Sequence, residues 1–149
     1  MPSTRFTVHT TLTPREAMTV ITDFGPERAD RWPNVDDAHF QLHDQGPGWA
    51  EVTEGTSMGW ERERYAWDVE AGTVTIDTLE SNLWAPGSGW RYALTPGAGG
   101  GTDVEVTLVR HAASWQGRII GALVPVAGPL ALAKQFRTVF RRAEAGTDS

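Results

Sequence analysis

Hydrophobic and polar residues alternate along most of the chain, which is the pattern of half-buried β-strands. Residues 5–12 show it first, because Phe6, Val8 and Leu12 share one side. Between residues 36 and 112 the alternation returns in six segments, separated by turns rich in glycine and proline. The connections are of hairpin length, so the pattern predicts one antiparallel sheet of seven strands. The six later strands are expected over residues 38–43, 49–53, 60–69, 73–81, 90–94 and 104–110.

Two short helices are expected directly after the first strand. Thr13 suits an N-cap, Pro14 suits the first helical position, and Glu16 completes a capping box. The helix that these residues start is broken by Gly25-Pro26. A second short helical turn is expected over residues 27–31.

From Ser114 onward, apolar residues recur every three or four positions, which is the period of an amphipathic helix. Pro125 and Pro129 predict a kink in the first half of this helix. One long helix covers seven strands only if the sheet curves around it, and that shape leaves space between helix and sheet. The pattern therefore predicts an α+β fold with an internal cavity.

Composition narrows the class of protein. The 149 residues suit a single domain, residues 1–149, that builds its own core. Cysteine is absent, which excludes disulfides, a thiolate zinc site and a cysteine nucleophile. Seven tryptophans are many for a domain of this size, and such side chains fill a large core or line an apolar pocket.

Charge and hydropathy bear on partners and location. A net charge of −6 and a pI of about 5.1 argue against nucleic acid as the main partner. Residues 115–149 hold five basic and two acidic side chains, which fits a solvated helix edge, a membrane surface or an acidic partner. The longest apolar run, residues 119–133, is short for a membrane span, so no stable membrane insertion is expected. The N-terminus lacks the apolar core of a signal peptide, and a cytoplasmic location is expected.

No metal site and no cofactor are predicted. His39 and His43 would share a face on a helix, but four residues of a strand span about 13 Å, too far for one ion. The glycine-rich segment 97–101 lacks the lysine and the following helix of a phosphate-binding loop.

The predicted strand over residues 60–69 carries charge on both faces. Trp60, Arg62 and Arg64 share one side, and Glu61 and Glu63 share the other. Either these charges form cross-strand ion pairs in solvent, or one row faces the cavity. In the second case a buried arginine such as Arg64 needs a carboxylate or a ligand anion as its partner. The sequence leaves both orientations open.

Two charged residues extend predicted core rows. Arg110 continues the row that ends at Leu108, and Glu80 continues the row that ends at Thr78. An ion pair between Arg110 and Glu80 at the end of the cavity fits this geometry. The alternative is that the strand ends before Arg110, whose side chain then reaches solvent.

Aromatic side chains are the main candidates for contact with a ligand. Trp90 and Tyr92 alternate with Arg91 and Ala93 on a strand that must face the helix. Core filling is the other explanation for each aromatic residue. The full candidate set for ligand contact is Trp60, Arg64, Trp84, Trp90, Tyr92, Arg110 and Trp115.

Several motifs together resemble those of one superfamily. They are Thr13-Pro14-Arg15-Glu16-Ala17, Asp23 with Trp32-Pro33-Asn34-Val35, Gly59-Trp60, Gly101-Thr102-Asp103-Val104 and the C-terminal segment 118–142. In them the chain resembles the START-like helix-grip superfamily, also called the SRPBCC or polyketide cyclase/dehydrase group. It departs from the pattern at Met18, where many relatives carry an aromatic residue.

The resemblance implies a fold and a type of site. The fold is a curved seven-stranded antiparallel sheet around a long C-terminal helix, with two short helices after the first strand. The site is a cavity for a hydrophobic ligand. The resemblance does not imply a reaction, because members of the superfamily bind lipids, sterols, hormones and aromatic polyketides, and only some are enzymes.

Three functional hypotheses follow. In the first, the protein, as a monomer or homodimer, binds a small hydrophobic molecule (aromatic, acyl or lipid-like) without catalysing a reaction. In the second, it is a cyclase or aromatase acting on a polyketide-like chain, with Tyr92, Glu80 and Arg110 as catalytic candidates. In the third, it binds a protein partner through an exposed strand edge or through the basic helix surface over residues 134–142.

Overall fold

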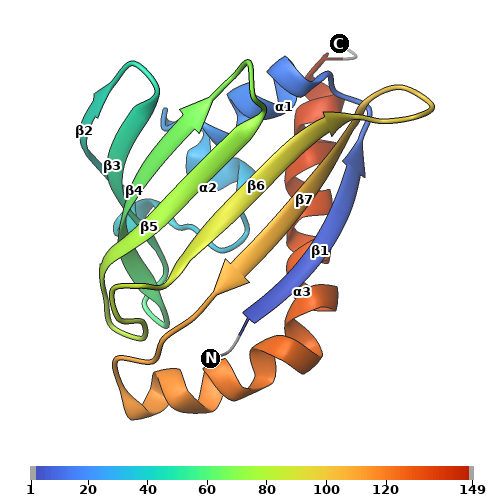
Figure 1. Ribbon diagram of the computed structural model, residues 1–149. Coiled ribbons are helices and arrows are strands. Elements are labelled where there is room, and N and C mark those ends of the chain that lie inside the picture. The colour runs from blue at the N-terminus through green and yellow to red at the C-terminus, as the bar shows by residue number, and fades with distance from the viewer. Residues whose placement is uncertain (1–2, 148–149) are drawn as a thin grey trace.

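The computed structural model describes residues 3–147, and the side chains of these residues outside 125–127 and 147. In chain order the elements are β1 (Ser3–Thr10), α1 (Pro14–Ile21), α2 (Arg28–Arg31), the 3₁₀ helix η1 (Asp37–His39), β2 (Gln41–Gly46), β3 (Trp49–Gly55), β4 (Trp60–Asp68), β5 (Thr73–Ser81), β6 (Gly89–Pro96), β7 (Thr102–Val109) and α3 (Trp115–Thr147). The seven strands form one antiparallel sheet in the order β1-β7-β6-β5-β4-β3-β2. Figure 1 shows this sheet curving around α3, which confirms the predicted α+β architecture.

The start of α1 forms as the sequence predicts. The backbone N–H of Glu16 donates to the Thr13 hydroxyl at 3.2 Å, and the backbone N–H of Thr13 donates to the Glu16 carboxylate at 2.9 Å. These two bonds satisfy donors that the first turn of a helix leaves open. The helix ends earlier than the apolar pattern suggests, at Ile21, and the buried Met18 faces the core.

One predicted strand begins later than expected. Asp36 accepts a hydrogen bond from the backbone N–H of His39 at 2.9 Å, and this cap turns residues 37–39 into η1. Residues 37–39 therefore form a 3₁₀ turn where the start of the strand was expected, and β2 begins at Gln41.

The long C-terminal helix is bent, as its prolines predict. Its parts Trp115–Val124 and Gly128–Gly146 meet at 86°. In Figure 1 the second part runs along β1, while the first part turns across the end of the sheet. Within the described residues, no single helix is long and apolar enough to cross a membrane. The two parts of α3 pass that test only when taken together, by length and composition.

Phe136 fixes the second part of α3 on the sheet. Its ring meets those of Phe6, Trp32 and Tyr92 edge to face, with centroids 5.6, 5.3 and 5.5 Å away. Edge-to-face contacts of this kind add to the stabilisation that burial supplies. They join β1, the segment after α2, and β6 to one point on the helix.

The capping box makes a prediction about stability. We expect Thr13→Ala to lower the free energy of unfolding by about 1 kcal/mol, because the donor at the third helical position loses its acceptor. Thr19→Ala is the matched control, since Thr19 is exposed on the same helix and its hydroxyl donates to the Arg15 carbonyl. Urea unfolding of both variants measures the difference. Equal midpoints for the two variants would contradict a role for the cap.

Candidate functional site

A cavity of about 370 Å³ lies between the sheet and α3. Its walls come from the segment around α2, from β3, β4 and β6, and from the connection before β6. A second hollow of about 320 Å³ shares Trp84, Trp90, Arg110 and Gln135 with the first and continues along α3. The predicted space between helix and sheet is therefore present, and it extends toward the bend of the helix.

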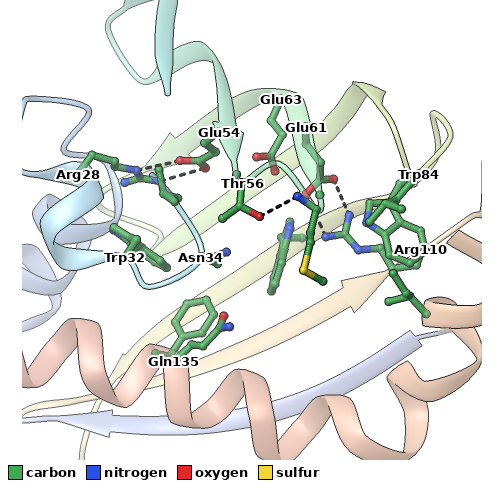
Figure 2. A pocket seen from close by; sticks show the side chains of 18 of the residues that line it. Arg28, Trp32, Asn34, Glu54, Thr56, Glu61, Glu63, Trp84, Arg110 and Gln135 are labelled. Carbon is green, nitrogen blue, oxygen red and sulfur yellow. Dashed lines mark hydrogen bonds and ion pairs between the residues drawn. The ribbon is translucent and has the colours of Figure 1, made fainter. Parts of the chain in front are cut away.

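β4 turns its acidic row toward the cavity. Glu61, Glu63 and Tyr65 line the cavity, and Figure 2 shows Glu61 and Glu63 directed into it. The opposite row lies on the outer face of the sheet, where Arg62 pairs with Glu51 at 2.8 Å. The row that contains Tyr65 faces inward because burying an aromatic ring stabilises the fold more than burying an arginine without a partner.

One buried ion pair closes the α2 end of the cavity. The Arg28 Nε donates to Glu54 at 3.0 Å and its Nη2 donates to the other carboxylate oxygen at 3.2 Å. Nη2 also donates to the Tyr65 hydroxyl at 2.8 Å, and that hydroxyl donates to Glu54. Nη1 donates to the carbonyls of Ile21 and Asp23 at 2.7 and 3.2 Å. All five guanidinium N–H groups thus have partners.

The environment of Arg28 keeps it charged. Burial acts against the charged form, but the neighbouring Glu54 and Tyr65 outweigh it and hold the pKa of Arg28 above its ordinary value. The guanidinium also lies over the rings of Phe24 and Trp32, with centroid distances of 4.7 and 4.9 Å. For Tyr65, burial first and then Glu54 raise the pKa well above its ordinary value, so its hydroxyl keeps its proton.

A second ion pair stands at the other end of the cavity (Figure 2). Arg110 donates two hydrogen bonds of 2.6 and 3.0 Å to the Glu61 carboxylate. The Thr78 hydroxyl donates to the same carboxylate at 2.8 Å. The guanidinium lies between two indole rings, 4.9 Å from the centroid of Trp84 and 5.3 Å from that of Trp90. Two-point contact and ring stacking are the geometry that arginine favours over lysine.

Glu63 lies between these two ion pairs and is only 3% exposed. Among the described residues, none donates a hydrogen bond to its carboxyl group or forms an ion pair with it. Burial is the largest cause that raises the pKa of Glu63 well above its ordinary value, and Glu61 and Glu54 add to it. Arg110 and Arg28 act in the other direction and do not offset these causes. The buried site therefore favours the protonated carboxyl more strongly than water does.

Two further polar groups of the cavity wall lack partners within the described part of the chain. The buried indole N–H of Trp32 meets no acceptor. The Tyr92 hydroxyl makes no hydrogen bond with a described residue, and burial, followed by Glu63, raises its pKa well above the ordinary value. Both groups are hydrogen-bond donors at neutral pH.

The structure brings four of the candidate residues together and leaves the others apart. Trp84, Trp90, Tyr92 and Arg110 line the cavity. The residues outside its wall are Trp60, which is half-buried, Arg64 and Glu80, which are exposed, and Trp115, which is 68% exposed on the first turn of α3.

The placement of Arg64 and Trp115 has a simple physical reason in each case. Arg64 lies on the outer face of β4, where its guanidinium covers the Trp49 ring at 4.6 Å, so the orientation that puts it in the cavity is wrong. Trp115 lies at the far end of the bent helix, away from the part that Phe136 holds against the sheet.

The predicted pair between Arg110 and Glu80 is also wrong, because β5 contains a bulge. Arg62 of β4 pairs with Glu80, but the next residue, Glu63, pairs with Thr78. The extra residue, Leu79, reverses the alternation beyond it and turns Glu80 to the outer face. Arg110 does face the cavity, and its partner there is Glu61.

Sequence reasoning did not single out Arg28, Glu54 or Tyr65 as site residues. The position of Tyr65 in the same row as Glu61 and Glu63 was the available signal for the inward face. Nothing local distinguishes Arg28 from the other arginines of the chain, because its partner Glu54 lies 26 positions away. His39 lies in η1 rather than on a strand, and it pairs with Asp36. No group of three metal-ligating side chains occurs among the residues that the structure describes.

The raised pKa of Glu63 makes stability depend on pH. Below the ordinary pKa of 4.5, folded and unfolded chains are both protonated at this position. Above it the unfolded chain releases the proton first, so the wild type loses stability as pH rises toward the folded pKa, by at most about 1.4 kcal/mol per pH unit. We expect Glu63→Gln to remove this loss in urea unfolding at pH values above 4.5.

The matched control is Glu51→Gln on the outer face. The hydrogen bond from Arg62 lowers the pKa of Glu51. The stabilisation that this carboxylate contributes is therefore fully present at any pH above its ordinary pKa. The stability difference between wild type and this variant should stay constant over the pH range in which the Glu63→Gln difference grows. A constant difference for both variants would contradict the raised pKa of Glu63.

Comparison with solved structures identifies proteins of the same fold. No family model matches the sequence, and no curated protein matches it. Among solved structures, TTHA0849 from Thermus thermophilus is similar with a TM-score of 0.79 and 15% identity, over 97% of this chain and 99% of that one. The Zhui aromatase/cyclase from Streptomyces sp. R1128 is similar with a TM-score of 0.73 and 16% identity, over 95% of this chain and 93% of that one.

A START superfamily protein from Mycobacterium smegmatis is similar with a TM-score of 0.73 and 13% identity, over 96% of this chain and 97% of that one. These structures match nearly the whole length of the chain at low identity, so they report on its fold. The order of its elements, the curved antiparallel sheet and the long closing helix agree with that comparison. The chain has the START-like helix-grip fold of the SRPBCC type.

Proposed function

We propose that the protein binds a small, largely apolar molecule, aromatic or acyl in character, inside the cavity between the sheet and α3. The observation that carries this proposal is the wall of the cavity. Trp32, Trp84, Trp90, Tyr92 and Phe136 surround a space of about 370 Å³, which lies within the range of about 300–1,000 Å³ typical of small-molecule sites.

The second hollow supports an elongated ligand. It continues from the cavity past Leu108, Val124 and Leu132, which are apolar side chains. A ligand with a flat head in the cavity and an aliphatic extension along α3 would bury both parts. The fold comparisons fit this proposal, because the similar structures include a START superfamily protein and an aromatase/cyclase. The cytoplasmic location and the monomeric or homodimeric state stay predictions from the sequence.

Filling the cavity tests the proposal. Gln135 of α3 lines both hollows and is half-buried, so Gln135→Trp places an indole in the ligand space. We expect this variant to bind the neutral dye Nile red at least about tenfold more weakly than the wild type, since dye and indole compete for one volume. Fluorescence titration measures the affinity.

The control is Gln116→Trp, the same exchange at an exposed position of the same helix. It should leave the affinity for Nile red unchanged, and thermal unfolding should show both variants folded. The proposal fails if the wild type shows no saturable binding, or if the two variants bind the dye equally.

A cyclase or aromatase is the second candidate function. The observation in its favour is that Glu63 and Tyr92, two proton-bearing groups, line one cavity. Such groups can transfer protons during enolisation and loss of water from a poly-β-ketone chain. If this function is correct, the wild type turns over a model poly-β-ketone and Tyr92→Phe loses most of that turnover. Saturable binding without turnover would favour the binding function.

A further inference from the structure

We propose that Glu63 acts as a hydrogen-bond donor toward the ligand and that it makes the cavity select an uncharged carbonyl compound over the corresponding carboxylate. This inference rests on the proposed ligand-binding function and names the chemical class of the ligand. Glu63 lies in the cavity wall, and no described side chain forms a hydrogen bond or an ion pair with its carboxyl group.

The charges of the two arginines of the cavity are already paired with carboxylates. Every N–H of Arg28 has a partner in Glu54, Tyr65 or a backbone carbonyl. Arg110 directs both of its Nη atoms at Glu61. Each arginine is therefore neutralised by its own carboxylate, so an anionic ligand would meet no unpaired positive charge on either one. Among the described residues that line the cavity, no lysine or histidine supplies another cation.

The groups that face Glu63 come from every surrounding element. Four of them carry charge: Glu54 of β3, Glu61 of β4, Arg28 of α2 and Arg110 after β7. The other four are polar and uncharged at neutral pH: Tyr65 of β4, Thr78 of β5, Tyr92 of β6 and Gln135 of α3. Two carboxylates are thus balanced by two guanidinium groups. A third negative charge at Glu63 would have no counterion in a buried site, and a bound proton removes that charge.

A protonated carboxyl donates one hydrogen bond, and an acceptor on the ligand completes it. The Tyr92 hydroxyl on the neighbouring wall is a second donor without a described partner. A ketone, ester or amide oxygen accepts from both groups, while the aromatic walls hold the rest of the molecule. A ligand carboxylate would instead meet three glutamates and two arginines that are already paired, and its desolvation would remain uncompensated.

A matched pair of probes tests the inference. The neutral ketone 2-acetylnaphthalene and the anion 2-naphthoate share their ring system and differ in charge. At neutral pH we expect the wild type to bind the ketone at least about tenfold more tightly, measured by calorimetric titration. Glu63→Leu should lose about tenfold of the ketone affinity, the factor that one hydrogen bond contributes, and Glu63→Gln should stay within about threefold because its amide also donates.

Other outcomes overturn the inference. If Glu63→Gln binds the ketone tenfold more tightly than the wild type does, the native carboxyl is ionised and repels the carbonyl. Equal or tighter binding of 2-naphthoate by the wild type contradicts the selectivity directly. Glu51→Gln, the outer-face control, should change neither affinity.

A measurement without any ligand separates this inference from the proposed function. The infrared spectrum of the wild type at neutral pH should contain a carboxylic acid C=O band that is missing from Glu63→Gln. Absence of that band means that Glu63 is ionised and overturns the inference, even if both probes bind. If the band is present and neither probe binds, the protonated donor stands and the selectivity is contradicted, while the Nile red titration decides the ligand-binding function separately.

Discussion

The ion pair between Arg28 and Glu54 is the interaction on which the site depends. Moving both charges out of water costs desolvation free energy. The structure offsets that free energy because each N–H donor of the guanidinium has an acceptor. The pair ties α2 to β3, and through the Tyr65 hydroxyl to β4 as well. Trp32 follows directly after α2 and packs on Phe136 of α3. The ion pair therefore sets the distance at which the short helices, the sheet and the long helix enclose the cavity.

The cavity combines apolar walls with charges that cancel in place. Arg28 and Arg110 stand at its two ends, each with its own carboxylate, and aromatic rings cover both guanidinium groups. Glu63 between them has no such partner, so its environment favours the proton over the charge. The interior is polar in its hydrogen-bonding capacity and close to neutral in charge. That combination distinguishes it from a purely apolar lipid pocket and from an anion-binding site.

Local patterns predicted most of the fold. Alternation identified seven strands, the capping box at Thr13 located α1, and the two prolines anticipated the bend in α3. The site was predicted less completely. Trp90 and Tyr92 were found because alternation next to a required helix fixes their face. Glu80 was misplaced, because a single extra residue in β5 reverses the alternation and leaves no mark in composition.

The sequence by itself determined the element order, the antiparallel pairing and the need for a cavity, because these follow from periodicity and from the geometry of one helix against seven strands. The tertiary structure alone decided which face of β4 turns inward and which arginine meets which glutamate. The physical reason is range: periodicity is set by neighbours within a few residues, whereas Arg28 and Glu54 are 26 positions apart, and Glu61 and Arg110 are 49 apart. Only the folded, curved sheet brings these charges together and places Glu63 between them.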